Sequence, residues 1–126
     1  MSKDRKSSTL LHAFKYAIDG IVSTFKNERN IRIEFCFAVV ALALSALLKL
    51  SPVEWAIIII LVVLVLALEL ANSAIENLVN LVSPEKNPLA KQVKDGMAAS
   101  VLVMALGSAA AGLIIFINAA LRLGGI

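Results

Sequence analysis

The chain of 126 residues is 60% hydrophobic and 17% charged, and its formal net charge is +3. A soluble domain of this length is usually about 45–50% apolar, so the composition indicates an integral membrane protein with one domain over residues 1–126. The small net charge predicts no nucleic-acid partner. With one cysteine, Cys36, and one histidine, His12, the chain has no internal disulfide and no multi-cysteine or multi-histidine metal site. Any bound metal must then be held by oxygen, as Mg²⁺ is.

The chain starts with a short polar and basic stretch that lacks the apolar core of a signal peptide. A helix is predicted from about residue 8 to 27, because apolar residues then recur every three or four positions and charged residues occupy the other side. This pattern is typical of an amphipathic helix that lies on a membrane surface. A simple anchoring role would also explain it. The apolar side carries Leu11, Phe14, Ile18, Ile21, Val22 and Phe25.

Residues 27–34 form a dense polar stretch directly before the first long apolar segment. Arg29 and Arg32 can mark the cytoplasmic boundary of a membrane helix. Glu28 and Glu34 are not needed for that purpose. The two acids either pair with the neighbouring arginines, which contributes little at an exposed site, or take part in function.

Three membrane-spanning helices are predicted at about 31–49, 53–82 and 95–121. Residues 49–52 form a tight turn, and Pro52 suits the first turn of the next helix. Residues 83–95 are predicted to form a loop, because Pro84 and Pro88 interrupt a helix. Lysines and arginines gather before the first span and in this loop, so both are expected on the cytoplasmic side.

The second span contains the chain's most informative residues. An uncharged apolar run from residue 55 to 68 is followed by two acids and two amides that fall within an arc of roughly 80° on one helix face. An ionisable residue inside a membrane helix is costly, and it marks a functional site by default. The alternative is that the helix has reached the headgroup region at this point and the acids are solvated. The four residues are Glu69, Asn72, Glu76 and Asn80.

These groups, with Glu28, Glu34, Lys94 and Asp95, are all expected at a similar depth on the cytoplasmic side. Carboxylates bind Mg²⁺, which usually arrives with nucleotide phosphates. Lys94 and the start of the third span can neutralise phosphate. A poorly solvated carboxylate such as Glu69 can act as general base. The combination suits phosphoryl transfer, although the sequence has no Gly-rich phosphate loop of the soluble kinases.

The sequence resembles the small prokaryotic membrane lipid kinases, the diacylglycerol kinase and undecaprenol kinase family. The resemblance covers nearly the whole chain. It rests on Glu69-x-x-Asn72-Ser73-Ala74-Ile75-Glu76, on Lys94-Asp95, and on Asn27-Glu28-x-Asn30-x-Arg32 upstream. It implies an all-α homotrimer in the bacterial cytoplasmic (inner) membrane, with a surface helix, three spans and a cytoplasmic N-terminus. The implied activity is phosphorylation of the hydroxyl of a membrane lipid, diacylglycerol or undecaprenol, by ATP with Mg²⁺.

The resemblance also implies roles for single residues. Glu69 would be the catalytic base, Asn72 would orient the reacting groups, and Glu28 and Glu76 would bind the metal that accompanies ATP. The lipid would lie near Glu34, Glu69 and Ala98. The nucleotide would contact Tyr16, Glu28, Glu76, Glu85, Lys86, Asn87, Lys94 and Asp95.

Two positions depart from the family's pattern, since Asn80 stands where Asp is usual and Asn87 where His is common. Neither is a proposed base or metal ligand, so activity is expected. The segment Pro88-Leu89-Ala90-Lys91 resembles the branch of the family that phosphorylates undecaprenol.

Two other functional classes stay open on the residues alone. They are a small proton-coupled transporter that uses Glu69, and a non-catalytic membrane adaptor.

Overall fold

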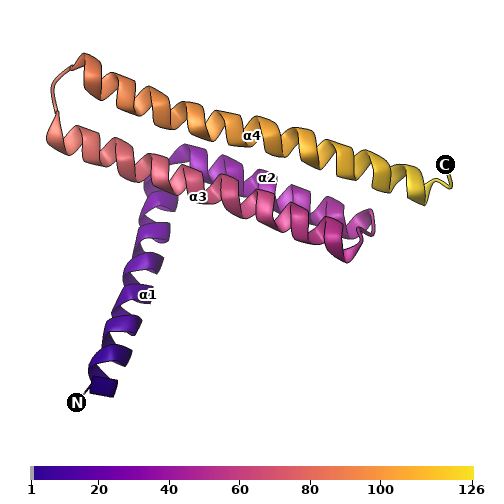
Figure 1. Cartoon of the computed structure of the whole chain (residues 1–126), viewed down its shortest axis with the longest axis horizontal. Coiled ribbons are helices and arrows are strands. Elements are labelled where there is room, and N and C mark those ends of the chain that lie inside the picture. Colours follow the sequence, from indigo (N-terminus) through magenta and orange to yellow (C-terminus); the bar gives the residue numbers. More distant parts are fainter. Residues whose placement is uncertain (1) are drawn as a thin grey trace.

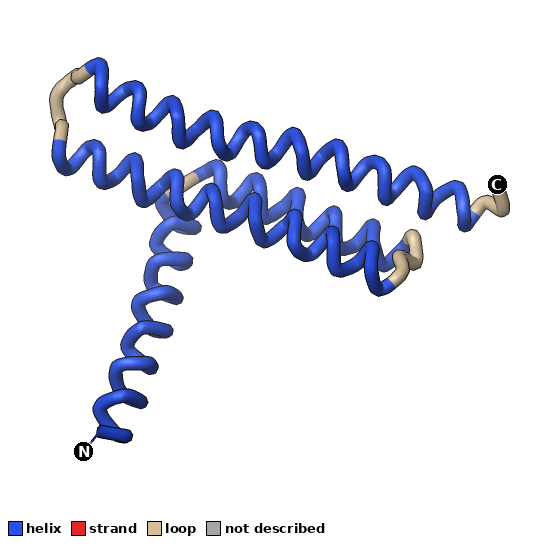
Figure 2. The backbone as a smooth tube through the Cα atoms, viewed as in Figure 1, coloured by secondary structure: helices blue, strands red, loops and turns tan. Residues whose placement is uncertain are grey.

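The computed structural model describes the backbone of residues 2–126 and the side chains from residue 8 onward. Figure 1 shows the described chain as helices joined by short links, and Figure 2 shows no strand in it. Helices α2, α3 and α4 lie side by side, and α1 projects away from them (Figure 1). The helices are α1 Ser2–Asn27, α2 Arg29–Leu47, α3 Pro52–Val82 and α4 Pro88–Leu123.

Helices α2, α3 and α4 are each long and apolar enough to cross a membrane, which confirms that the chain has three long apolar helices. Helix α3 packs against both α2 and α4, while α2 and α4 make little direct contact. Most large apolar side chains of the three helices are exposed in the single chain. These surfaces must face lipid or other protein.

A sharp elbow joins α1 to α2. Glu28 is the one residue between the two helices, and its backbone is extended, with φ −113° and ψ 123°. Arg32 reaches back across the elbow, where one guanidinium nitrogen donates to the carbonyl oxygens of Phe25 at 2.8 Å and Lys26 at 3.0 Å. These carbonyls end α1 and have no partner within the helix. Phe25 also packs edge to face on Phe35, with ring centroids 5.4 Å apart. The hydrogen bonds of Arg32 thus hold the elbow.

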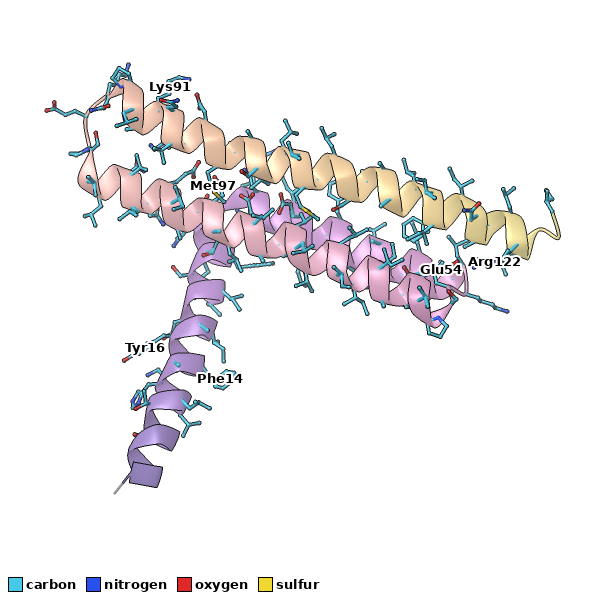
Figure 3. All side chains as sticks on the ribbon, viewed as in Figure 1. Phe14, Tyr16, Glu54, Lys91, Met97 and Arg122 are labelled. Carbon is cyan, nitrogen blue, oxygen red and sulfur yellow. The ribbon has the colours of Figure 1, made fainter. Side chains whose placement is uncertain are left out.

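At the end of α2, α3 and α4 that lies away from the elbow, a capping box and an ion pair hold the chain. Ser51 accepts from the Glu54 amide at 3.3 Å, and the Glu54 carboxylate accepts from the Ser51 amide at 3.1 Å, with Pro52 in the first turn as predicted. Glu54 also receives two hydrogen bonds from Arg122, at 2.6 and 2.9 Å. Figure 3 shows this pair linking the start of α3 to the end of α4.

The predicted loop over residues 83–95 is wrong in its second half, because α4 already begins at Pro88. Proline is tolerated in the first turn of a helix, where its missing N–H has no partner to lose. The Asn87 side chain caps this turn by accepting from the amides of Leu89 at 2.8 Å and Ala90 at 3.4 Å. Lys94 and Asp95 therefore lie inside α4 rather than at its N-terminus, and two of the first amides are already occupied.

Candidate active site

The site begins on the inward face of α3, which changes character along its length. Toward the start of the helix this face buries Ile58 and packs apolar side chains against α2 and α4. Three to four turns beyond Ile58, the same face buries Glu69, Asn72 and Ser73, with exposed fractions of 3%, 7% and 3%. Buried polar groups of this kind are uncommon unless they are paired or used. Glu69 is thus enclosed by protein, and the alternative of a solvated acid does not hold for it.

Three other carboxylates interact with Glu69. Glu28 at the elbow and Glu76, two turns further along α3, both act on it electrostatically. Glu34, one turn into α2, does so as well. The carboxamides of Asn30 and Asn72 lie beside the Glu69 carboxylate and can donate to it. The fold therefore joins the elbow, α2 and α3 in one acidic cluster, as the sequence predicted.

Like charges that interact in this way repel one another, and a bound cation or a proton on one carboxyl relieves the repulsion. Within the described part of the chain, no group of three or more Asp, Glu, His or Cys side chains is arranged as a metal cage. Magnesium is not usually held by such a cage; it keeps several waters and is bound by one or two carboxylates together with substrate phosphates. Glu28 and Glu76, with the unpartnered Oδ1 of Asn72, supply donors of that kind. The residues present fit Mg²⁺.

The basic groups of α4 bond to side chains outside this cluster. Lys94 donates to the Oδ1 of Asn80 on α3, one turn beyond Glu76. Lys91 and Asp95 form an exposed ion pair along one face of α4. Asn80, one of the two departures from the family's pattern, is therefore the contact that holds Lys94 against α3.

The remaining residues of the predicted nucleotide site do not converge in the single chain. Tyr16 is 67% exposed on α1, and Figure 3 shows it on the helix that projects away from Lys91 at the start of α4. Glu85 and Lys86 are exposed in the link between α3 and α4, and Ala98 is exposed on α4. Asn87 is engaged as a helix cap.

Four polar residues of interest were not predicted as part of a site, and Asn30, which lies beside Glu69, is one of them. Arg32 positions the elbow that carries Glu28, as described above. Ser73 and Ser108 have buried hydroxyls without a hydrogen-bond partner among the described residues. For Ser73 the sequence signal was its place beside Asn72 on the polar face. For Ser108 there was no sequence signal of a site, because it is one small residue among many in an Ala- and Gly-rich helix.

Comparison with known proteins agrees with the resemblance seen in the sequence. The sequence model of the family described as prokaryotic diacylglycerol kinase matches residues 15–116. An undecaprenol kinase of Bacillus subtilis is 38% identical over 118 residues, which cover 92% of this chain and 96% of that protein. A diacylglycerol kinase of Haemophilus influenzae is 36% identical over 103 residues, or 82% of this chain and 87% of that protein.

A diacylglycerol kinase of Pseudomonas aeruginosa is 38% identical over 96 residues, covering 75% of this chain and 78% of that protein. The family match spans all four helices, from the middle of α1 to the last third of α4. It includes the acidic cluster and the Lys94 contact. The chain therefore belongs to the prokaryotic diacylglycerol kinase family.

Proposed function

We propose that this chain transfers the γ-phosphate of ATP to the hydroxyl of a membrane lipid, with Mg²⁺, at the cytoplasmic surface of the bacterial inner membrane. Lipid phosphorylation follows from the family. The observation that carries the site is Glu69, a residue that is 3% exposed and whose carboxylate interacts electrostatically with Glu28, Glu34 and Glu76. Neither a transporter nor an adaptor accounts for that cluster together with the family match.

In this mechanism Glu69 removes the proton of the lipid hydroxyl. The hydroxyl oxygen forms a bond to the γ-phosphorus, the bond from that phosphorus to the β–γ bridging oxygen breaks, and ADP leaves with that oxygen. Asn72 and Asn30, which lie beside the Glu69 carboxylate, orient it toward the hydroxyl. Because phosphoryl transfer needs little covalent chemistry from the protein, such positioning supplies much of the catalysis.

Glu28 and Glu76 would hold Mg²⁺, which when bound neutralises charge on the phosphates. These residues come from different elements, the elbow and α3. Glu28 is the residue that links α1 to α2, and the hydrogen bonds of Arg32 hold this link. The site is therefore assembled by the elbow as much as by α3.

We further propose that the active enzyme is a homotrimer with sites shared between subunits. Tyr16 and the start of α4 lie apart in one chain, and the exposed apolar surfaces of the spans are available for contacts between copies. A neighbouring subunit would bring its Lys94 and Asp95, or its Tyr16, to the nucleotide. Helix α1 would lie along the cytoplasmic membrane surface with its apolar side toward the lipid.

The lipid we favour is undecaprenol. The Bacillus subtilis relative, whose match covers 92% of this chain, is named undecaprenol kinase. The segment Pro88–Lys91, which resembles that branch, forms the first turn of α4. Diacylglycerol is the second candidate, because other relatives of similar identity are named diacylglycerol kinases.

The test is phosphate transfer from ATP labelled at its γ-phosphate, in detergent micelles with Mg²⁺. Undecaprenol and diacylglycerol are compared side by side, and the reaction is repeated without Mg²⁺. We expect labelled lipid phosphate in both micelles, with faster transfer to undecaprenol, and none without the metal. Folded protein that labels neither lipid would overturn the proposal.

A further inference from the structure

A long apolar groove runs between α2 and α4 over the face of α3. It exists because α2 and α4 both pack on α3 but hardly touch each other. Its volume is about 560 Å³, within the range of roughly 300–1,000 Å³ that is usual for ligand pockets. The walls are almost entirely aliphatic and aromatic, with Phe37 and Leu44 from α2, Val62 from α3, and Leu113 and Phe116 from α4.

Only two side chains that line the groove carry polar atoms, Glu34 on α2 and Ser108 on α4. In both, a side-chain oxygen is buried and lacks a hydrogen-bond partner among the described residues. Other helical hydroxyls here bond the carbonyl one turn earlier, such as Ser45 to Ala41 at 2.7 Å and Ser100 to Gly96 at 3.1 Å. The Ser108 hydroxyl does not take this usual local partner, and an unmade buried hydrogen bond is destabilising.

The two polar atoms lie at the same end of the groove. Helices α2 and α4 both run antiparallel to α3, so they start at the same end of the groove. Glu34 is the first residue of α2 that lines the groove, and Ser108 is among the first of α4. This end faces the catalytic cluster, because Glu34 interacts electrostatically with Glu69. From Glu34 to Leu44 the groove then continues along α2 for ten residues, roughly 15 Å at the helical rise.

A ligand that fits this groove has one polar group at the end near Glu69 and an apolar chain beyond it. A hydroxyl is a suitable polar group, because it can donate to a carboxylate and accept from a serine at the same time. An apolar helix of a second copy would cover the walls but would leave both polar atoms unpartnered. The chemistry of the lining therefore favours a lipid alcohol over a protein helix.

We propose that Ser108 is a positioning residue for the lipid substrate, donating a hydrogen bond to the oxygen at the polar end of the lipid while its apolar chain lies in the groove. Glu34 lines the same end of the groove from α2 and accepts the hydroxyl hydrogen while the lipid is being positioned; this proton turns to Glu69 when transfer begins. The proposal rests on the proposed kinase function and adds a residue of α4 to the lipid site. Ser108 acts before the chemical step, by holding the hydroxyl at the depth of Glu69.

The test is steady-state kinetics of Ser108→Ala in micelles, with lipid varied as mole fraction and ATP varied separately. Loss of one neutral hydrogen bond predicts a KM for lipid that is about three- to tenfold higher. The kcat and the KM for ATP should stay within about twofold, and Ser108→Thr should restore most of the lipid KM. Ser100→Ala is the matched control, because it removes a hydroxyl from the same helix whose bond is local.

The outcomes separate this proposal from the proposed function. A wild-type protein that transfers no phosphate would refute the kinase function itself. An active wild type whose lipid KM is the same in Ser108→Ala, or shifts as much in Ser100→Ala, would refute the role of Ser108 alone.

A second variant, Ala109→Phe, tests the occupant of the groove, because Ala109 lines it next to Ser108. A lipid in the groove predicts a higher lipid KM with an unchanged oligomer size on cross-linking in micelles. A smaller oligomer would show that a second copy occupies the groove, and it would overturn the proposal.

Discussion

The elbow between α1 and α2 gives a prediction that no inspection of the catalytic residues alone would suggest. Arg32 donates to the carbonyl oxygens of Phe25 at 2.8 Å and Lys26 at 3.0 Å, and Glu28 is the residue between the two helices. Arg32→Gln removes this link while leaving every proposed ligand in place. We therefore expect a defect in Mg²⁺ dependence rather than in the chemical step.

The size of the defect follows from the two hydrogen bonds. Hydrogen bonds from a charged donor contribute about 1.5–3 kcal/mol when protected, and we take about 1 kcal/mol each at this exposed position. The total of about 2 kcal/mol corresponds to a factor of about 30 in the ratio of elbow conformations. The edge-to-face contact of Phe25 and Phe35 retains part of the geometry. Since apparent affinity scales with the competent fraction, which can fall by no more than this factor, the Mg²⁺ concentration for half-maximal rate should rise by up to about 30-fold.

The assay is phosphate transfer as a function of free Mg²⁺ at saturating ATP and lipid. Arg29→Gln is the matched control, because it removes the same charge from the same end of α2. Arg32→Lys should give an intermediate value, since one ammonium group can still reach a carbonyl oxygen. Equal shifts in Arg32→Gln and Arg29→Gln would mean that charge alone matters, and the reasoning about the elbow would be refuted.

Three further predictions concern contacts outside the cluster. Asn87→Ala removes the cap of α4 and should cost about 0.5–2 kcal/mol, seen as faster hydrogen exchange in the first turn of α4, whereas Asn87→Asp should exchange like wild type. Asn80→Asp turns the contact with Lys94 into an ion pair; since exposed pairs contribute little, the transfer rate should stay within about threefold, and a tenfold change would contradict this. Glu54→Arg and Arg122→Glu should each lower the temperature of thermal inactivation. Combining them should restore it in part, because the ion pair returns while the capping box of Glu54 with Ser51 stays lost. A double variant no better than Glu54→Arg would show that the pair does not link α3 to α4.

The features that the sequence predicted well are those set by local chemistry. The uncharged run before Glu69 predicted the body of a membrane helix, and the acids that follow it inside the same helix were predicted to mark a functional site. Pro52 after a serine marked the start of α3. Glu28 and Glu34 interact with Glu69, as the expected order of the spans predicted. The two acids lie at the start of the first span and Glu69 lies toward the end of the second, so all three were expected near one membrane surface.

The start of α4 was predicted too late because Pro88 was taken only as a helix breaker. The sequence did contain the correct signal, since Asn87 before Pro88 is an N-cap followed by a proline in the first turn. The consequence is functional. Lys94 and Asp95 point from the body of a helix, and the amides at its start are capped by the protein itself.

Contacts between distant parts of the chain could not be predicted. Glu54 and Arg122 are separated by 68 positions. Taken alone, each is an ordinary charged residue at the end of a helix, and nothing in the sequence pairs the two. The pairing of Lys94 with Asn80 depends on the register of α4 against α3, which apolar periodicity does not determine. The groove and the unpartnered Ser108 hydroxyl arise only because α2 and α4 stand apart on α3.

The most direct test of the proposed mechanism is a paired measurement on Glu69→Gln, which keeps the size of the side chain and removes its capacity to take a proton. Phosphate transfer to lipid and binding of an ATP analogue with Mg²⁺ are measured on the same purified protein. If Glu69 is the base, transfer falls by at least a thousandfold, or more than about 4 kcal/mol in the barrier, while nucleotide binding stays within a few-fold of wild type. A Glu69→Gln protein that still transfers phosphate within tenfold of wild type would contradict the assignment of Glu69 as the base.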